Sequence, residues 1–458
     1  MRTAPRHDHH DHTDPQPGGP SAPPELPAPP ARRPPDGPRI APRISPRIAV
    51  VGGSLTGPAV ALLLAQAGFA HVRLYEAMPA SSPLGGGLIS LEHPSLGVLD
   101  QLGIAQHEYV HTRSETIWQT PVHGRVLGEP VRRRYPGRFT TWTQLHQALT
   151  RRIPPGMAQT GMRLTGLATR RGRPLLRFAD GRTEAADIVV FADGRASTGR
   201  ALLDPDRRLR YAGYVGHRGT LPHNPTDNPT DNPADSPVGI VDFWRLEPGP
   251  GVQFNIAPVP GGVDWTFYLN ATEARYAEMF GAAPHRRLFA QPHHVTDVSR
   301  AHVDAHAARH LPEPYATAVR RSVTRTAFPV MDIDPPTRMV WPVGDGFAVL
   351  LGDALAPVRA HTGRGANNGI EQANGLATVL GQHLRHGADL GTALIGWHRR
   401  HLPDAVTAVR RGPEIGARLG LGSPSPSSPP ATPAAGVAVA VGREPSPVLA
   451  DVVLAGAR

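Results

Sequence analysis

The chain has 458 residues, a formal net charge of +10 and no cysteine, which excludes disulfide bonds, thiolate metal sites and a cysteine nucleophile. It also contains no lysine, which excludes a Schiff-base lysine and a Walker-type phosphate lysine. Its arginines are scattered among acidic residues, without the basic stripe that is typical of nucleic-acid binding, so we expect no nucleic-acid partner.

Both ends of the chain are predicted to be disordered tails. Residues 1–46 are rich in Pro and His, and residues 421–458 repeat Ser, Pro and Ala, so neither segment buries enough apolar surface to offset chain entropy. The first tail has no apolar core of a secretory signal, and no stretch of about 18 apolar residues occurs anywhere. We therefore expect a soluble, cytoplasmic protein without membrane contact. The HDHHDH run of the first tail has incidental metal affinity at most, and we assign no metal site.

The globular part begins with a strand, a glycine turn and a helix. Residues 47–51 read as a buried parallel strand, residues 58–69 as a helix, and residues 72–76 as the next strand of a βαβ unit. The turn GGSLTG is a G-x-G-x-x-G fingerprint with serine in place of its second glycine. Gly52 permits the tight turn, Gly57 permits close packing of the helix on the strand, and N–H groups at the helix start face a pyrophosphate.

The following strand supplies the second half of this signal. Glu76 ends it, 24 residues after Gly52 (76 − 52), where it can accept hydrogen bonds from ribose hydroxyls. The alternative is a plain βαβ turn that binds nothing. We predict a dinucleotide site formed by Gly52, Gly53, Ser54, Leu55, Thr56, Gly57 and Glu76.

The central part of the chain is predicted to be mostly strands. Residues 140–153 have a helical pattern, and residues 188–192 form a strong buried strand that runs into Asp193 and Gly194. An Asp-Gly pair at a strand end suits phosphate and ribose contacts, although any strand-to-loop turn can look the same. Residues 205–335 look like a mostly antiparallel region, interrupted by an Asn-Pro repeat at 223–237 that we predict to be an exposed loop.

A strand, a glycine loop and a long helix return near the C-terminus, and residues 392–409 form a second helix. Asp353 can accept a ligand hydroxyl, and Pro357 stiffens the loop. The following residues bring backbone N–H groups to the start of a helix, where a partial positive charge favours an anion. The alternative is a glycine-rich surface loop. The candidate binding residues here are Gly352, Asp353, Pro357, Gly363, Gly365, Ala366 and Asn367.

With these three motifs in this order, residues 47–410 resemble the FAD-dependent aromatic hydroxylases of the p-hydroxybenzoate hydroxylase type. The likeness is closest to the 2,6-dihydroxypyridine hydroxylase-like branch, where the fingerprint also reads Gly-Gly-Ser and a segment resembles YAGYVGHRGTLP. The resemblance implies an α/β fold with a Rossmann-like FAD-binding domain split in sequence, an inserted, mostly antiparallel substrate domain and C-terminal helices. The implied boundaries are 47–204 and 336–420 for the FAD-binding domain and 205–335 for the substrate-binding sheet.

The resemblance also implies the chemistry. NAD(P)H reduces bound FAD, O₂ adds to the flavin C4a atom, and the resulting hydroperoxide hydroxylates an aromatic or N-heteroaromatic ring. The turn residues, Glu76, Asp193 with Gly194 and the last glycine loop would hold FAD. Phe191, where the family prefers glycine, would place a bulky ring near the cofactor path, and Gln372 replaces a frequent aspartate. The partners implied are the ring substrate and O₂, with a homodimer left open.

Candidates for catalysis come from the same region. A base near a phenol-like substrate would help the reaction, which favours His217 as base, Arg218 as anion clamp and His361 as a second candidate; a structural strand histidine is the alternative for His217. Trp265 and Phe267 share one face of a strand and are either sheet core or a wall of the substrate site. Two other functions remain open: another FAD-dependent oxidase, reductase or epoxidase, and a non-catalytic flavin-binding protein.

Overall fold

The computed structural model describes residues 45–80, 86–112, 114–222 and 240–422. The two predicted tails, the Asn-Pro repeat and the HDHHDH run lie outside these residues, apart from a few positions at their inner edges. No helix in the described part of the chain is long and apolar enough to cross a membrane.

A six-stranded sheet forms the nucleotide-binding half, and its strands come from distant parts of the chain. Four strands pair in parallel around β1, whose residues are all buried, as expected for the centre of a parallel sheet. The antiparallel β19 closes one edge. The strand order is β19 (Val340–Val343), β20 (Gly346–Leu350), β13 (Ile188–Phe191), β1 (Ile48–Val51), β2 (Val72–Tyr75) and β9 (Ala158–Gln159).

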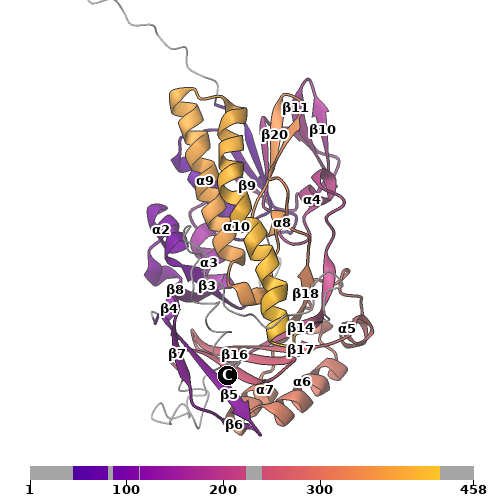
Figure 1. Ribbon diagram of the computed structural model, residues 1–458. Helices are drawn as coiled ribbons and strands as arrows, with labels where there is room; N and C mark the ends of the chain where they lie inside the picture. The colour runs from indigo at the N-terminus through magenta and orange to yellow at the C-terminus, as the bar shows by residue number, and fades with distance from the viewer. Residues whose placement is uncertain (1–44, 81–85, 113, 223–239, 423–458) are drawn as a thin grey trace, which may run out of the picture. The chain divides into compact units, whose positions relative to one another are not determined.

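Helices and a small sheet cover this half. Helix α1 packs against β1 and β2 and also against α9. Helix α9 in turn packs on α10, and the two lie side by side in the ribbon (Figure 1). Phe178 of the three-stranded sheet β10–β12 packs its ring 5.0 Å from that of Tyr75 in β2. The elements are α1 (Thr56–Gln66), α4 (Thr198–Leu203), α8 (Gly352–Leu355), α9 (Gly365–His386), α10 (Leu390–Arg418), β10 (Leu164–Arg170), β11 (Arg173–Phe178) and β12 (Thr183–Ala185).

The second half is an eight-stranded, mainly antiparallel sheet, one face of which α6 and α7 cover through a shared apolar core. The strands β5 to β7, which lie early in the chain, join this sheet by pairing with β15 and with one another. Its members are β18 (Arg325–Asp332), β14 (Arg210–Pro222), β17 (Gly262–Asn270), β16 (Val252–Val259), β15 (Phe243–Gly249), β5 (Thr116–His123), β6 (Val126–Leu127) and β7 (Val131–Arg134).

The predicted fold class is confirmed: the nucleotide-binding sheet is split in sequence, and a mostly antiparallel sheet is inserted between its parts. The helices α5 (Glu273–Phe280), α6 (Asp297–His310) and α7 (Glu313–Arg321) were not predicted. The remaining elements are α2 (His93–Gln101), α3 (Trp142–Thr150), β3 (Leu88–Glu92), β4 (Val110–Thr112), β8 (Gly137–Thr141) and the short 3-10 turns at Gln106–Glu108, Pro292–His294 and Ala360–Thr362. The predicted domain boundaries stay a prediction.

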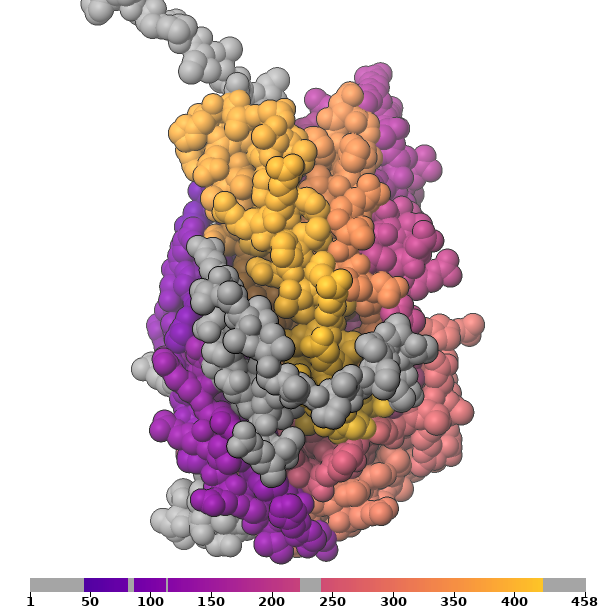
Figure 2. All heavy atoms as spheres, viewed as in Figure 1, coloured from indigo at the N-terminus to yellow at the C-terminus, as the bar shows by residue number. Residues whose placement is uncertain are grey.

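Helix α10 is longer than the predicted 392–409 and continues through Pro403 and Pro413. It starts beside α9, and one side of it lies at the molecular surface (Figure 2). Beyond its C-terminus the chain meets the eight-stranded sheet, where the side-chain amide of Asn270 donates a hydrogen bond to the carbonyl of Gly420 at 2.9 Å. Helix α10 and the residues after it therefore contact both the nucleotide-binding half and the eight-stranded sheet.

Candidate active site

The glycine turn between β1 and α1 lines one end of a cavity. Gly52 has a φ of +109°, a conformation that L side chains rarely adopt. A Cβ on Gly57 would lie 1.7 Å from the carbonyl oxygen of Gly52, so a side chain cannot be placed there without moving the backbone. Ser54, Leu55 and Thr56 line the cavity itself. The turn is therefore compact enough for a ligand to approach its backbone.

Glu76 lies beside this turn. Its two carboxylate oxygens accept hydrogen bonds from the N–H groups of Gly53, at 2.6 Å, and Met78, at 2.7 Å. Each oxygen keeps a lone pair for a further donor, because a carboxylate has about four acceptor positions. The geometry is thus compatible with the predicted ribose contact, which stays a prediction.

The Asp193-Gly194 pair differs from the prediction. The Asp193 carboxylate accepts hydrogen bonds from the Ser197 hydroxyl at 2.5 Å and from the N–H groups of Thr198 at 2.7 Å and Gly199 at 3.1 Å. It therefore holds the start of α4 and does not line the cavity, whereas Gly194, with a φ of +73°, does. The Asp193 side chain thus caps the start of α4, and the predicted cofactor contact of the Asp193-Gly194 pair stays a prediction.

Phe191 is fully buried and lies outside the cavity lining. A Cβ on Gly199 would lie 2.2 Å from its ring, so the ring packs beneath the start of α4. The expectation that this ring sits near the cofactor path is wrong, because the side chain points into the core of the six-stranded sheet.

The last glycine loop also lines the cavity and begins beside the turn, since a Cβ on Gly352 would lie 3.1 Å from the Thr56 hydroxyl. Gly352 has a φ of +56°, and its N–H donates to the side-chain oxygen of Gln372 at 2.8 Å. Asp353 faces the cavity; burial raises the pKa of its carboxyl, and the positive charges of Arg195 and Arg200 oppose that rise. Of the predicted FAD-binding residues of this loop, Pro357, Gly363, Gly365 and Ala366 also line the cavity.

Asn367 is buried and serves the packing of α9. Its side-chain oxygen accepts a hydrogen bond from the N–H of Glu92 at 2.8 Å, and its amide nitrogen donates to the carbonyls of Ser90, at 3.1 Å, and Gly363, at 2.7 Å. These contacts fix α9 to β3. The Asn367 side chain is absent from the cavity lining. The predicted role of Asn367 is to bring its backbone N–H to the start of α9, and this role stays a prediction.

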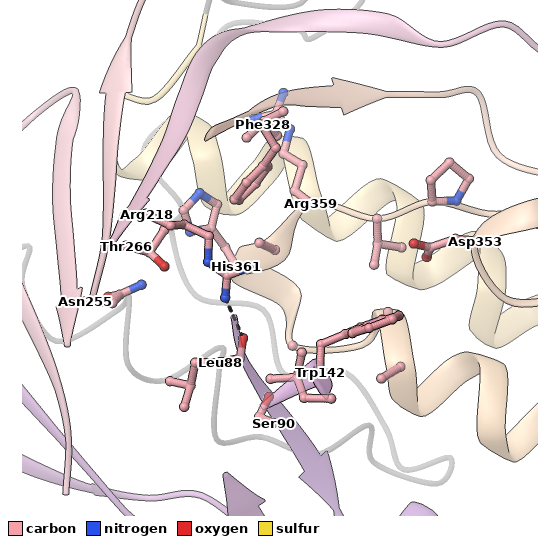
Figure 3. A pocket seen from close by; sticks show the side chains of 18 of the residues that line it. Leu88, Ser90, Trp142, Arg218, Asn255, Thr266, Phe328, Asp353, Arg359 and His361 are labelled. Carbon is pink, nitrogen blue, oxygen red and sulfur yellow. Dashed lines mark hydrogen bonds between the residues drawn. The ribbon is translucent and has the colours of Figure 1, made fainter. Parts of the chain in front are cut away.

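The cavity has a volume of about 370 Å³ and extends from these nucleotide-binding loops to the face of the eight-stranded sheet. Figure 3 shows Asp353 and Trp142 near one end and Arg218, Thr266 and Asn255 near the other. Trp142 donates its indole N–H to the Ser54 hydroxyl at 3.2 Å and so joins α3 to the glycine turn.

The sheet face that borders the cavity carries a row of polar side chains. Strand pairing places Arg218 of β14 opposite Thr266 of β17, Thr266 opposite Asn255 of β16, and Asn255 opposite Arg245 of β15. All four line the cavity. Because side chains alternate between the faces of a strand, the residues next to them in sequence point to the opposite side.

His217 lies on that opposite side, among residues of the helices. Its ring centroid is 5.9 Å from that of Phe280 and 6.2 Å from that of His302. Burial, with smaller contributions from His302 and His306, lowers the pKa of His217 to about 3. The prediction of His217 as the base is corrected, because its imidazole cannot reach a ring in the cavity.

Trp265 and Phe267 also face away from the cavity. The Trp265 indole N–H donates to the hydroxyl of Ser322 at 2.8 Å, and the Phe267 ring packs edge-on against Phe254 at 5.4 Å. Both belong to the core beneath α6 and α7. The substrate-wall prediction is therefore wrong, and the sheet-core alternative describes them.

Arg218 and His361 do line the cavity. Arg218 Nη2 donates to the carbonyl of Leu88 at 3.2 Å, as the dashed line in Figure 3 shows. The His361 ring lies 4.5 Å from that of Tyr268, and its Nε2 has no hydrogen-bond partner in the described part of the chain. Burial, then the charges of Arg245 and Arg359, lower the pKa of His361 to about 3, so the ring is neutral at pH 7.

Several polar cavity residues on the eight-stranded sheet were not named from the sequence, among them Arg245, Asn255, Asp264, Thr266 and Tyr268. Side chains of a strand alternate between the two faces of the sheet. Once Arg218 is known to face the cavity, every second residue of each neighbouring strand is therefore expected to face it too. Which residue of a neighbour lies opposite Arg218 depends on strand pairing and register, and a single sequence does not give these.

The residues present fit FAD. Two helix N-termini, those of α1 and α9, lie at the same cavity and suit an anionic pyrophosphate and a ring that becomes anionic on reduction. Carboxylates at Glu76 and Asp353 suit the hydroxyls of a dinucleotide with a polyol chain. A side chain at Gly52 or Gly57 would collide with neighbouring backbone atoms. Glycine at both positions therefore keeps the turn tight, so that a ligand can come close to its backbone.

No family model matches the chain, but individual proteins do. It is 31% identical over 347 residues to 6-hydroxynicotinate 3-monooxygenase from Bordetella bronchiseptica, which covers 73% of this chain and 82% of the relative. It is 28% identical to 2,6-dihydroxypyridine 3-monooxygenase from Paenarthrobacter nicotinovorans, over 88% of this chain and 98% of the relative.

A solved structure shares the fold. The 2,6-dihydroxypyridine-3-hydroxylase from Arthrobacter nicotinovorans superposes with a TM-score of 0.71 at 24% sequence identity, over 86% of this chain and all of the other. The likeness extends across both sheets rather than the nucleotide-binding half alone.

Proposed function

Because the chain belongs to the FAD-dependent aromatic-ring monooxygenases, we propose that its cavity binds a hydroxylated aromatic or N-heteroaromatic ring against the polar face of the eight-stranded sheet. FAD is the cofactor and NAD(P)H the co-substrate of this reaction. The observation that carries the proposal is the continuity of one cavity from the glycine turn and Asp353 to Arg218 and His361.

We assign the binding of FAD to the loops at one end of this cavity. Bound FAD supplies the redox chemistry, which consists of accepting electrons from NAD(P)H and activating O₂. The protein supplies placement and exclusion of water. The residues that would hold FAD are Gly52, Gly53, Ser54, Leu55, Thr56, Gly57, Glu76, Gly194, Gly352, Asp353, Pro357, Gly363, Gly365 and Ala366.

At the sheet end, Arg218 and His361 are the predicted residues that reach the substrate. Arg218 offers a guanidinium to an anionic or electron-rich ring, and the ring of Phe328 lies 5.9 Å from its central carbon. His361, neutral because it is buried beside two arginines, offers an acceptor nitrogen at Nε2. Both side chains are held in place by neighbours, which orients a bound ring.

The test is a visible spectrum of the purified protein, followed by NADH and NADPH oxidation with O₂ across hydroxypyridine and hydroxybenzoate acids. We expect an FAD spectrum, and pyridine-nucleotide oxidation that one ring compound stimulates with formation of a hydroxylated product. A protein that takes up no FAD contradicts the proposal. Bound FAD without any ring-stimulated oxidation would instead favour a non-catalytic flavin-binding protein.

Two finer points are also proposals. A cytoplasmic location is supported by the need for NAD(P)H, which is a cytoplasmic metabolite. For oligomeric state we propose a homodimer, which sedimentation of the FAD-loaded protein tests directly.

A further inference from the structure

One end of the cavity is apolar, although it lies on the same sheet face as the row of polar side chains. Five of the side chains that line this end belong to one hydrophobic cluster or pack against it, and four of them are buried. They come from β3, β5, β8, β15 and the turn before β8. We call this set the apolar end; its residues are Leu88, Ile117, Tyr135, Phe139 and Phe243.

The apolar end continues the sheet face next to the polar row. Phe243 lies two residues before Arg245 in β15 and therefore points to the same face. Strand pairing places Ile117 of β5 opposite Phe243. The ring of Phe139 stacks between two others, with its centroid 5.1 Å from that of Phe243 and 5.1 Å from that of Tyr135. A stack of three rings thus borders the cavity beside the polar row.

Leu88 shows which part of the cavity this end belongs to. Its carbonyl accepts the hydrogen bond from Arg218 Nη2 at 3.2 Å. Figure 3 shows Leu88 on the same side of the cavity as Arg218 and Asn255, and away from Asp353. The apolar end therefore lies in the part of the cavity that we assign to the ring substrate, rather than among the loops that we assign to FAD.

The small sheet of β3, β8 and β4 closes this end and is fixed to the eight-stranded sheet by polar contacts. His111 of β4 has its Nε2 2.7 Å from the carbonyl oxygen of Pro258 in β16. The Glu115 carboxylate, at the start of β5, accepts hydrogen bonds from Arg138 of β8 at 2.6 Å and from Arg134 of β7 at 3.1 Å. Because closely packed side chains give way little, the apolar end limits the size of whatever group enters it.

The chemistry of the apolar end favours a hydrocarbon group over a charged one. None of its five side chains carries a charge, since burial raises the pKa of the Tyr135 hydroxyl and keeps it neutral. A charged group placed there would lose its hydration without a charged partner in the apolar end, which is costly. A hydrocarbon group placed there removes apolar surface from water on both sides of the contact, which is favourable.

We propose that the ring substrate carries an uncharged hydrocarbon substituent and that this substituent occupies the apolar end. The assignment rests on the proposed function. The polar atoms of the ring then face the polar row, while the substituent contacts Phe243, Phe139 and Ile117. Phe243 lies at the boundary between the polar row and the apolar end and limits the length of the substituent.

The test measures binding without turnover. The FAD-loaded, full-length protein is titrated in the absence of NAD(P)H with two series of unbranched alkyl compounds, the 4-alkylphenols and the 5-alkyl-2-hydroxypyridines. Each series runs from the parent ring to the hexyl derivative. Dissociation constants come from changes in flavin absorbance. The limiting length is the number of alkyl carbons beyond which the affinity no longer rises.

In at least one series, each added CH₂ is expected to tighten binding by about 3- to 4-fold, the gain for burying one methylene, up to the limiting length. Phe243→Leu should raise the limiting length by at least one carbon, because it shortens a side chain that closes the apolar end. The same variant should weaken binding of the shorter alkyl compounds, which lose contact with the aromatic ring.

Phe254→Leu is the matched control. Phe254 of β16 is fully buried, but it belongs to the core beneath α6 and α7 on the opposite face of the sheet. The same substitution there should leave the limiting length unchanged. If Phe243→Leu does not retain FAD, Ile117→Val tests the same end with a smaller change and should also raise the limiting length.

An affinity that rises along neither series overturns the assignment, and so does the same limiting length in the wild type and in the variant of the apolar end. If FAD binds and a ring compound is hydroxylated while the alkyl chain has no effect, the assignment of the apolar end is wrong and the proposed function stands. Failure of the wild type to bind FAD removes both.

Discussion

Gly57 is the residue with the least room in the cofactor turn, because the position of a Cβ there lies 1.7 Å from a backbone carbonyl. Ser54, by contrast, faces the cavity and has space for its hydroxyl, which accepts a hydrogen bond from Trp142. The second and third glycine positions of the fingerprint therefore differ in whether they accept a side chain. The second glycine can be replaced by a small polar residue, and the third cannot be replaced without moving β1 or α1.

Gly57→Ala is predicted to destabilise the protein by at least about 1–3 kcal/mol, the usual cost of overpacking, because the clash is with backbone rather than with a flexible side chain. The measurement is chemical denaturation of the apoprotein. Gly97→Ala is the matched control: this helical glycine has no atom within 4 Å of a Cβ, and alanine should stabilise its helix by up to about 1 kcal/mol. Equal stability of the two variants would contradict the packing argument.

Asp353→Ala is predicted to weaken FAD binding by about 10-fold or more, since a hydrogen bond to a charged group is lost where the carboxyl faces the cavity. Equilibrium dialysis of the apoprotein with FAD measures the change. Asp345→Ala, in the turn between β19 and β20 outside the cavity lining, is the control. Unchanged FAD retention in Asp353→Ala would mean that the last glycine loop does not hold the cofactor.

At the scale of single elements, strand β14 shows that two residues adjacent in sequence can have different roles because their side chains lie on opposite faces of the sheet. His217 and Arg218 are adjacent, yet one packs under helices and the other faces the cavity. On the helix side His217 continues into a column of histidines spaced four residues apart on α6, His302, His306 and His310. No group of three or more potential ligands among the described residues is placed to hold a metal ion. The rings contact one another, with centroids 4.6 Å apart for His302 and His306 and 5.6 Å apart for His306 and His310.

The histidine column predicts a pH-dependent stability. Burial lowers the folded-state pKa of His217 from 6.5 to about 3 and that of His302 to about 4, with Arg325 and Arg275 among the neighbouring charges. Protons therefore bind the unfolded state first. The stabilisation is fully present above pH 6.5 and is lost as the pH falls toward 3, with a slope of up to about 1.4 kcal/mol per pH unit for one histidine.

Thermal melts of the wild type and His217→Leu between pH 7.5 and 4.5 check this expectation. The wild type should lose Tm faster than the variant as the pH falls, because the variant has one fewer buried group to protonate on unfolding. His71→Leu, an exposed histidine, should follow the wild-type profile. Parallel profiles for the wild type and His217→Leu would show that His217 does not contribute.

At the scale of the whole molecule, a buried ion pair ties the last glycine loop to the eight-stranded sheet. Arg359 donates through Nε and Nη2 to the two carboxylate oxygens of Asp332 in β18 at 2.6 and 2.5 Å, and its side chain is 5% exposed. The guanidinium also lies 5.3 Å from the centre of the Tyr214 ring in β14. The loop that lines the predicted flavin site is thus fixed to the sheet that lines the substrate end.

Arg359→Met is predicted to destabilise the protein by up to about 3–5 kcal/mol, because it leaves the Asp332 carboxylate, whose side chain is only 18% exposed, without its partner. Arg210→Met breaks a bidentate pair of similar geometry with Asp334 in which both side chains are more than half exposed, so it should cost less than about 1 kcal/mol. Urea denaturation measures both. In a double-mutant cycle with Asp332→Asn, the double variant should be destabilised by much less than the sum of the two single variants. Additive losses of unfolding free energy would exclude direct coupling between Arg359 and Asp332.

The amino-acid sequence by itself determined the nucleotide-binding half and the order of its motifs. The βαβ unit at 47–76, the left-handed Gly52 and the glycine loop after Asp353 are local features, set by short apolar runs and by conformations that only glycine adopts easily. The resemblance carried by those motifs led to the cofactor and the class of reaction.

Only the tertiary structure decided which side chains meet at the substrate end. Arg218, Asn255, Arg245 and Asp264 come from four strands whose pairing and register are non-local, and a shift of one residue would have put His217 in the cavity instead. Asp193 became a helix cap for the same reason, since the use of a carboxylate depends on which donors the fold brings near it. Local sequence patterns determine whether a segment is a helix, a strand or a turn, and the contacts between segments determine the role of each side chain.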